Sequence, residues 1–214
     1  MRVAIYSDIA CPWCYIGERR FTRALADRPD AEAVEVVFRP YQLDPDLPET
    51  PQPLMQRLEE KFGVQKDAAL ERVMAMGEEE GLTFRFDEAL AVNTFTAHRL
   101  LWWAEQEATP ATQRALAEQL FAAHFTHGDN VADPDVLADV AAEVGLDRER
   151  TRTFLASDEG TDAVQALIER AQRLGIRAVP TFVFDDESAV QGAQPADTFR
   201  RVLDDVMEEA SASE

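Results

Sequence analysis

Hydrophobic positions at the start of the chain follow two different spacings. Val3 and Ile5 belong to a short apolar run that indicates a strand. Apolar residues from 14 to 25 then recur at helical intervals, with no helix-breaking residue before Pro29. A second strand is predicted around residues 34–39. The chain therefore begins with a predicted strand–helix–strand unit.

Helical patterns dominate the middle of the chain. Five prolines between residues 40 and 53 indicate an extended segment, and helices are predicted from there to residue 174. One of them is predicted to begin at Pro134 with Asp133 as its N-cap. Strands return at 181–185 and 189–191 and are followed by a last helix. This order of elements predicts an α/β fold.

Composition excludes several classes of protein. The chain has 214 residues, of which 46% are hydrophobic, as in globular proteins rather than disordered or fibrous ones. Its net charge of −20 argues against nucleic-acid partners and anionic membrane surfaces, both of which require clustered basic residues. No stretch approaches the ~18–20 apolar residues of a membrane span, and the first residues lack the apolar core of a secretory signal. We therefore expect a cytoplasmic protein.

The basic residues are unevenly divided between 19 arginines and only two lysines, Lys61 and Lys66. One interpretation is a surface adapted to stay hydrated at high salt, where screening removes the self-repulsion of an acidic protein. The other is a codon bias toward arginine. Neither interpretation identifies a substrate.

The only two cysteines, Cys11 and Cys14, are separated by two residues. A structural disulfide across so short a loop would stabilise little, because the effect grows with loop length. A zinc site would need further ligands such as His98, His124 or His127, but about 110 residues separate Cys14 from His124, unlike compact zinc motifs. No metal is therefore expected.

The position of the two cysteines indicates redox chemistry. Cys11 is predicted at the N-terminus of the first helix, with Pro12 in its first turn. The unpaired N–H groups and the helix dipole favour negative charge there and so stabilise a thiolate at Cys11. Cys14 follows one turn later and can reach the same sulfur. This geometry assigns nucleophilic attack to Cys11 and resolution to Cys14.

Two motifs far apart in the chain resemble a known family. Cys-Pro-Trp-Cys at residues 11–14 and Val179-Pro180-Thr181 are similar to the DsbA-like branch of the thioredoxin-fold family. The longer run over residues 7–17, with Asn93-Thr94 and His98-Arg99-Leu100 later, most resembles its FrnE-like cytosolic members. The resemblance implies that Pro180 is a cis proline packed against the dithiol. It also implies that Val179 offers its backbone to a substrate peptide in strand-like pairing.

The resemblance also implies a domain organisation. The expected fold class is α/β, a thioredoxin-like fold with a large helical insertion. Residues 1–45 and 175–208 would form the two parts of the core, 46–174 the insertion, and 209–214 a disordered tail.

The implied function is a thiol–disulfide oxidoreductase that acts on protein or peptide thiols and disulfides through a mixed disulfide. Its only redox group would be the dithiol, and Pro12 and Trp13 would influence its potential and contact substrate. Oxidation, reduction and isomerisation remain open, although a reducing cytosol favours the latter two. The sequence does not indicate an oligomeric state.

Two alternatives come from different classes of function. One is a glutathione-dependent isomerase or transferase of aromatic compounds, as in 2-hydroxychromene-2-carboxylate isomerase and its relatives, which resemble this chain but carry serine in place of Cys11. Glutathione is accordingly a candidate cosubstrate. The other is a non-catalytic zinc-binding or interaction module.

Residues in the predicted insertion carry two interpretations each. Asn93 and His98 are candidate cleft residues, the first to hydrogen-bond substrate and the second to moderate the charge of the dithiol. Alternatively, Asn93 caps a helix and His98 is a structural histidine. Trp102 and Trp103 could form an apolar substrate surface, but aromatic residues on helices more often pack in the core.

Overall fold

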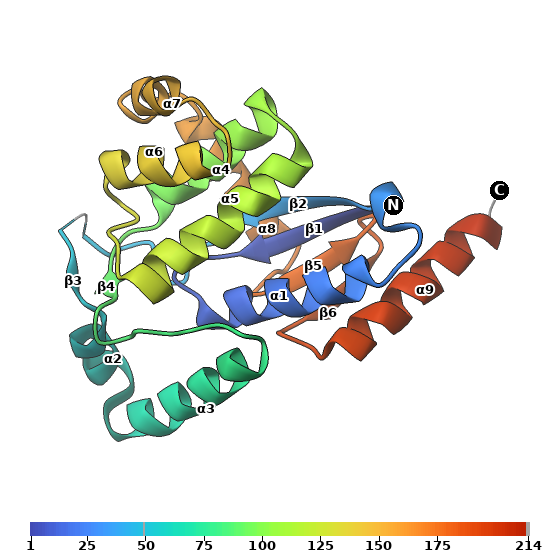
Figure 1. The fold of residues 1–214 in the computed structure, drawn as a ribbon, viewed down its shortest axis with the longest axis horizontal. Coiled ribbons are helices and arrows are strands. Elements are labelled where there is room, and N and C mark those ends of the chain that lie inside the picture. Colours follow the sequence, from blue (N-terminus) through green and yellow to red (C-terminus); the bar gives the residue numbers. More distant parts are fainter. Residues whose placement is uncertain (49, 213–214) are drawn as a thin grey trace.

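A four-stranded sheet lies at the centre of the computed structural model, which describes residues 1–48 and 50–212 apart from the side chains of residues 64 and 210–212. The strand order is β2-β1-β5-β6 (Figure 1). β1 runs parallel to β2, whereas β5 is antiparallel to both β1 and β6. The strands are β1 Arg2–Ser7, β2 Glu35–Pro40, β5 Thr181–Phe184 and β6 Ser188–Gln191.

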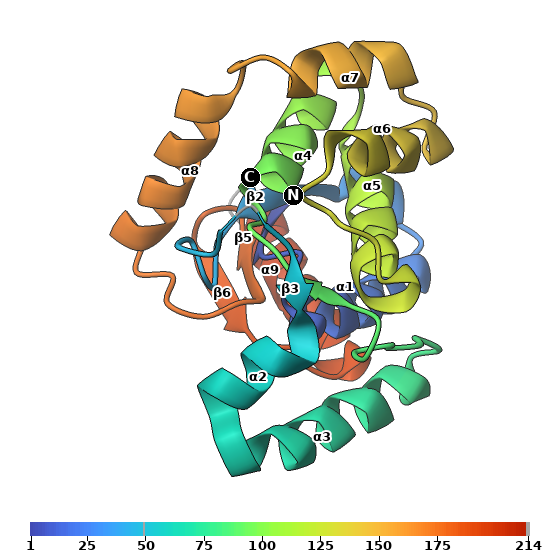
Figure 2. The ribbon, with the colours of Figure 1, turned by 90° about the vertical axis from the view of Figure 1, so that its left-hand side faces the viewer.

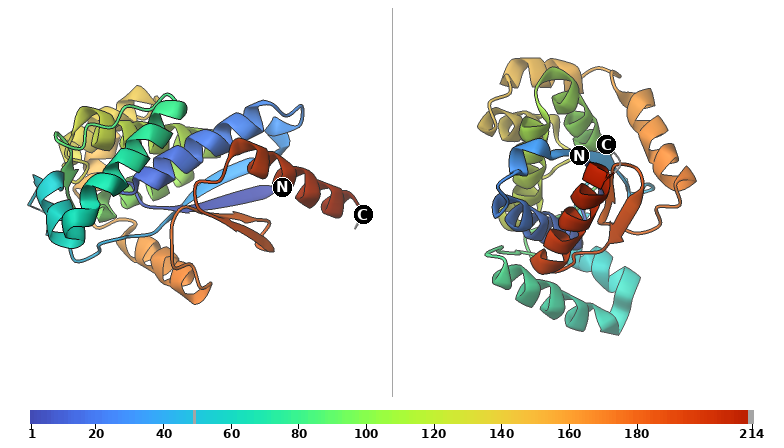
Figure 3. Two further views of the ribbon diagram at one scale, coloured as in Figure 1. Left: turned by 90° about the horizontal axis from the view of Figure 1, so that it is seen from below. Right: turned by 90° about the vertical axis from the view of Figure 1, so that its right-hand side faces the viewer.

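Two helices cover one face of this sheet. α1 (Pro12–Ala26) connects the parallel pair β1 and β2, which cannot be joined by a tight turn, and α9 (Ala196–Ala212) lies beside it (Figure 3). Phe21, Phe182 and Phe199 pack together beneath them, with ring centroids 4.5–5.4 Å apart and no exposed surface. Each such ring contributes roughly 1.5–3 kcal/mol by its burial.

A helical insertion lies between β2 and β5 and confirms the predicted α/β fold with inserted helices. α8 covers the sheet face opposite α1 and α9 (Figure 3), while α2 and α3 form a separate pair at the end of the molecule (Figure 2). Its helices are α2 Leu54–Phe62, α3 Lys66–Glu79, α4 Phe95–Glu107, α5 Pro110–Ala122, α6 Pro134–Glu143, α7 Arg148–Leu155 and α8 Thr161–Arg173. Short helical turns occupy η1 Ala31–Ala33, η2 Gly63–Gln65 and the π-helical η3 Ala123–His127.

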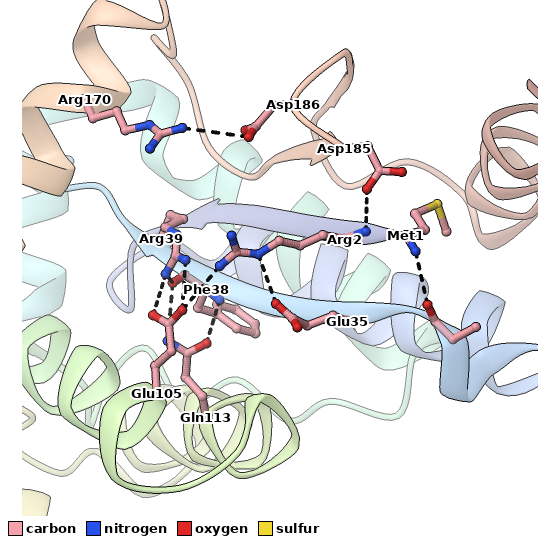
Figure 4. Close-up of polar contacts among 11 residues, drawn as sticks. Met1, Arg2, Glu35, Phe38, Arg39, Glu105, Gln113, Arg170, Asp185 and Asp186 are labelled. Atoms are coloured by element: carbon pink, nitrogen blue, oxygen red, sulfur yellow. Dashed lines mark hydrogen bonds and ion pairs between the residues drawn. The ribbon is translucent and has the colours of Figure 1, made fainter. Parts of the chain in front are cut away.

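The insertion is joined to the free edge of the sheet by a buried amide. Gln113 of α5 accepts the backbone N–H of Phe38 at 2.8 Å and donates to the carbonyl oxygens of Phe38 and Leu101 (Figure 4). Beside it, Arg39 forms two short contacts with the carboxylate of Glu105 on α4. Because an uncovered edge strand is prone to pair with other chains, these contacts both close β2 and dock α4 and α5.

Local sequence signals match several helix starts. Asp133 caps α6 by accepting the N–H of Asp135 at 2.8 Å, and Pro134 is the first residue of that helix, which confirms the predicted cap. The proline-rich segment of residues 40–53, which was expected to be extended, holds a two-residue strand, β3 (Gln52–Pro53), paired with β4 (Leu90–Ala91).

The C-terminus differs from the expected disordered tail at residues 209–214. α9 continues to Ala212 because its apolar positions, ending with Val202 and Val206, hold the helix against the core and propagation beyond them adds one hydrogen bond per residue. Residues 213 and 214 lie outside the described residues. Over the described residues, no helix is long and apolar enough to cross a membrane.

Candidate active site

The ends of two neighbouring strands bring the two sequence motifs together. β1 and β5 are antiparallel with Tyr6 opposite Thr181. The end of β1 and the start of β5 are therefore adjacent, so the chain that leaves β1 and the chain that enters β5 lie side by side. The first leads to Cys11 and the second comes from Val179 and Pro180. Strand register therefore places residues 168 positions apart in contact, and the Cys11 thiol points at the carbonyl oxygen of Val179 at 3.8 Å.

Cys11 occupies the N-cap position of α1 and Pro12 is the first helical residue. The first turn of this helix contains no acidic residue, so no carboxylate there opposes a thiolate. Cys14 lies one turn later, 3.3 Å from Cys11, and both are free thiols. Cys14 is 1% exposed and lies behind Cys11 in the core.

Pro180 packs against α1 at a glycine. The Val179–Pro180 peptide bond is cis, and Pro180 is buried beside the helix that carries the dithiol. A β-carbon added at Gly17 would lie 2.9 Å from Cγ of Pro180 and 3.4 Å from Cα of Ala193. Only glycine at position 17 therefore allows the helix and the proline loop to approach this closely.

The two thiols have different environments. Burial raises the pKa of the Cys14 thiol well above its ordinary value, and the hydrogen bond and charge of Cys11 raise it further. The Cys14 side chain is therefore held as a thiol.

A buried carboxylate holds the turn that presents Cys11. Asp8 is 1% exposed and accepts the backbone N–H groups of Ala10 at 3.3 Å and Leu43 at 2.6 Å. Burial alone would raise the pKa of Asp8, but hydrogen bonds from His98, Leu43 and Thr94 and the charge of His98 outweigh it and lower the pKa. Asp8 therefore stays ionised and joins the turn before α1 to the loop after β2 and the start of α4.

Cys11 lies in the wall of a cavity of about 320 Å³. The cavity opens between the start of α1, the loop after β2, the α2–α3 pair and the η3 segment. Most of its wall is apolar and includes Leu43, Leu54, Leu58, Phe62, Leu70 and Phe86. Leu43 and Phe62 are more than two-fifths exposed, so the entrance is apolar too. Cys11 is 3% exposed and Cys14 is not part of this wall, so reagents reach the dithiol at Cys11.

The cavity gathers basic residues in an acidic molecule. Both lysines of the chain, Lys61 and Lys66, line it together with Arg57. Arg57 binds Asp44 at 2.6 Å and Lys66 binds Glu59 at 2.5 Å. Lys61 is exposed and has no ion-pair partner within the described part of the chain. The entrance to Cys11 thus carries positive charge that the net charge of −20 does not suggest.

Comparison with known families matches this arrangement to one model, the DSBA-like thioredoxin domain, over residues 2–204. The chain belongs to the DSBA-like thioredoxin domain family. Family membership and the adjacent cysteines together identify a DsbA-like thiol–disulfide oxidoreductase.

Solved structures show the same fold. A probable DsbA oxidoreductase from Streptomyces coelicolor is 38% identical, with a TM-score of 0.88 over 98% of this chain and 91% of the other. A 2-hydroxychromene-2-carboxylate isomerase is 15% identical, with a TM-score of 0.73 over the whole of both chains. The cytosolic disulfide reductase DsbM from Pseudomonas aeruginosa is 18% identical, with a TM-score of 0.67 over 97% of this chain and 99% of the other. The last two likenesses concern the fold alone.

The remaining sequence-predicted residues of this DsbA-like domain lie around the dithiol in different ways. Trp13 is half-buried in the cavity wall, and the guanidinium of Arg72 lies 5.7 Å from its ring centroid. His98 is outside the wall; its Nε2 lies 3.0 Å from the carbonyl oxygen of Tyr41 and 3.4 Å from Asp8, so this nitrogen is the N–H donor.

Both the oxygen and the nitrogen of the Asn93 side-chain amide form hydrogen bonds within the domain. Its oxygen accepts from Gln42 at 3.0 Å and from the N–H of Phe95 at 2.9 Å, while its nitrogen donates to the carbonyl oxygens of Pro45 and Leu47. Asn93 therefore fastens the loop after β2 to the start of α4. Trp103 is 5% exposed and stacks on Phe154, as expected for a core residue.

Three features of the site have no counterpart among the sequence-predicted site residues. Asp8 lies within the motif run, but its partners come from distant segments. The sequence showed that the chain has only two lysines, but not that both line the cavity. His124, considered only as a zinc ligand, lines the cavity. Among residues 1–48 and 50–212, no group of three histidine, cysteine or acidic side chains could hold a metal, so the zinc alternative has no donor set there.

Replacing Asp8 with asparagine should destabilise this domain by ~2–4 kcal/mol at pH 7, because an amide NH₂ would face the N–H of Leu43 or Ala10. Since the native pKa of Asp8 is lowered, its contribution is complete above the ordinary value of 3.8 and is lost as the pH falls through the lower native value. Urea unfolding of the wild type and the variant between pH 7 and pH 2.5 measures the difference in their free energies of unfolding. Asp46→Asn, at an exposed position of the same loop, is the control. An equal difference in the free energy of unfolding at every pH would contradict the conclusion that Asp8 stabilises the fold in its ionised form.

Replacing Lys61 with glutamine should slow alkylation of Cys11 by iodoacetate about twofold at low ionic strength, because one solvated positive charge at the entrance is lost. The rate with uncharged iodoacetamide should not change, and 1 M salt should abolish the difference. Arg201→Gln on α9, also exposed but outside the cavity, controls for the change in net charge. Equal effects of the two substitutions would show that only net charge matters.

Proposed function

We propose that the protein exchanges disulfides of protein or peptide substrates through a mixed disulfide, with Cys11 as the attacking thiol and Cys14 as the resolving thiol. One observation carries this proposal: the two cysteines lie 3.3 Å apart, with Cys11 in the cavity wall and Cys14 behind it. A substrate sulfur that enters the cavity meets Cys11 first.

The bonds, electrons and protons of the exchange balance without any redox group other than the two cysteines. The Cys11 thiolate attacks one sulfur of a substrate disulfide, which forms a Cys11–substrate disulfide and releases the other sulfur as a thiolate. Cys14 then loses its proton and attacks Cys11, which forms the Cys11–Cys14 disulfide and releases the second substrate thiolate. The substrate gains two electrons, the protein loses two, and the released thiolates take up the protons given by the two cysteines. Run in reverse, the same steps oxidise a dithiol.

The environment of Cys14 orders these two steps. The negative charge and hydrogen bond of Cys11 are part of what raises the pKa of Cys14, after burial. Both are lost once the sulfur of Cys11 is bonded to substrate. The pKa of Cys14 then falls toward the value set by burial alone, so resolution follows attack rather than competing with it.

The surroundings of Cys11 suit an extended, apolar substrate segment. Val179 is half-buried in the cavity wall and its carbonyl oxygen faces the Cys11 thiol. A peptide that aligns with this backbone would gain main-chain hydrogen bonds with little dependence on its sequence. Trp13 and the leucines of α2 would contact its side chains.

Reduction or isomerisation in the cytoplasm is the direction that we propose. The dithiol is the only redox group that the exchange requires. A thiol of the glutathione class would return the Cys11–Cys14 disulfide to the dithiol, with two such thiols oxidised to one disulfide. The alternative of a glutathione-dependent isomerase is not proposed, because Cys11 stands where that group carries serine.

Replacing Cys14 with serine should trap the first intermediate. Incubation of the variant with a peptide disulfide should give one covalent adduct that intact-mass spectrometry detects and a reductant removes, because no thiol remains to attack the Cys11–substrate bond. The wild-type protein should show the adduct at less than about a tenth of that level.

The matched control is Cys11→Ser, which keeps Cys14. Because Cys14 is buried behind Cys11 and has a raised pKa, this variant should form at most a trace of adduct. Equal trapping by the two variants would contradict the assigned roles. A lack of adduct with Cys14→Ser would contradict the proposed function itself.

A further inference from the structure

One histidine in the cavity wall has no hydrogen-bond partner among the described residues at either of its ring nitrogens. His124 is 1% exposed, yet neither Nδ1 nor Nε2 forms a hydrogen bond to any described residue. A buried polar group without a partner is rare in folded proteins and requires an explanation. His98 shows the usual situation, because its Nε2 is engaged by Tyr41 and Asp8.

The backbone around His124 departs from regular helix. α5 ends at Ala122 and continues as the five-residue π-helical segment η3, Ala123–His127, which stops at Gly128 in the left-handed conformation. Segments of π-helix are uncommon and frequently occur at functional sites. Here the segment brings His124 and Phe125 together into the wall that also contains Cys11.

The position of the ring is defined by its neighbour. The Phe125 ring meets the imidazole edge to face, with centroids 4.5 Å apart. The other polar side chains of the cavity differ from His124. Asp8, Asp44, Arg57 and Lys66 are engaged with partners, and Lys61 is an exposed charge at the entrance. His124 is therefore a buried hydrogen-bonding group left free in a mostly apolar wall.

The chemistry of the ring limits what it can bind. Burial lowers the pKa of His124 to about 4, although the charge of Asp8 acts in the opposite direction, so the ring is neutral near pH 7. A neutral imidazole offers one N–H donor and one bare nitrogen acceptor. It suits an uncharged amide, whereas a carboxylate would find its counter-charge at Lys61 and not here.

We infer that His124 anchors the substrate: it hydrogen-bonds an uncharged peptide amide of the apolar segment whose sulfur reacts with Cys11. This inference rests on the proposed function and narrows its substrate class to disulfides carried by apolar, amide-containing segments. His124 is a binding residue, and it takes no part in the transfer of electrons or protons.

The test compares two disulfides in His124→Leu. The first probe is the disulfide-linked dimer of N-acetyl-leucyl-cysteine amide, and the second is diethyl disulfide, which has no amide. For the peptide probe, KM should rise about tenfold with kcat unchanged, as expected for one lost hydrogen bond made equally in the ground and transition states. KM for diethyl disulfide should stay within twofold of wild type. His124→Gln, which keeps a donor and an acceptor, should recover part of the lost affinity.

Stability and a neighbouring histidine provide the controls. Because His124 has no partner within the described residues, leucine should leave the midpoint of thermal unfolding unchanged or raise it. His127→Leu, at an exposed position of the same segment, should change neither KM nor this midpoint.

Three outcomes overturn the inference: an unchanged KM for the peptide probe, an equal rise in KM for both disulfides, or a clear loss of thermal stability in His124→Leu, which would mean that the ring serves the fold. Failure of the wild-type protein to reduce either disulfide would instead contradict the proposed function.

Discussion

The buried carboxylate of Asp8 is the contact on which the site depends. It binds the turn before α1 through Ala10, the loop after β2 through Leu43, and the start of α4 through Thr94 and His98. These segments belong to the sheet core and to the insertion, and His98 of α4 reinforces the junction through its contacts with Asp8 and the Tyr41 carbonyl. Burying a charge is costly unless hydrogen bonds compensate it, and the lowered pKa of Asp8 shows that here they do.

The turn held by Asp8 gives the two cysteines different surroundings. The turn that Asp8 holds directs Cys11 toward the cavity and the Val179 carbonyl, whereas helical geometry puts Cys14 behind it in the core. Close packing at Gly17 keeps Pro180 against the same helix. In a molecule with a net charge of −20, the cavity entrance nevertheless holds both lysines of the chain. These two lysines, which lie on α2 and α3, give the entrance positive charge despite the acidity of the whole molecule.

Local signals in the sequence were sufficient for the elements that carry the dithiol and for the start of α6. The first strand, the helix starting after Cys11 and the cap at Asp133 all depend on residues within a few positions of one another, and all are present. Family resemblance supplied the expectation that Pro180 lies against the dithiol, whereas the contact between Cys11 and Val179 follows from the register between β1 and β5. The extension of α9 to Ala212 was not predicted, because the polar residues at its end give no sign that the earlier turns of the same helix pack against the core.

The cavity wall could not be predicted in this way. Its residues come from α1, α2, α3, β4, η3 and several loops, and their proximity follows only from the docking of the insertion. Asn93 illustrates the point: its type suited both a cap and a substrate contact, and the partners that occupy its amide lie about fifty residues earlier. His124 was weighed only as a zinc ligand and set aside, because spacing alone does not reveal whether a ring nitrogen is paired.

The central claim is that the dithiol is reached from the cavity at Cys11 and that Cys14 stays protected behind it. The most direct measurement is a brief pulse of substoichiometric iodoacetamide on the reduced protein at pH 7, followed by peptide mapping of the labelled cysteine. The structure predicts label on Cys11 with less than about a tenth as much on Cys14, because Cys14 is buried with a raised pKa. Equal labelling of the two residues, or preferential labelling of Cys14, would contradict it.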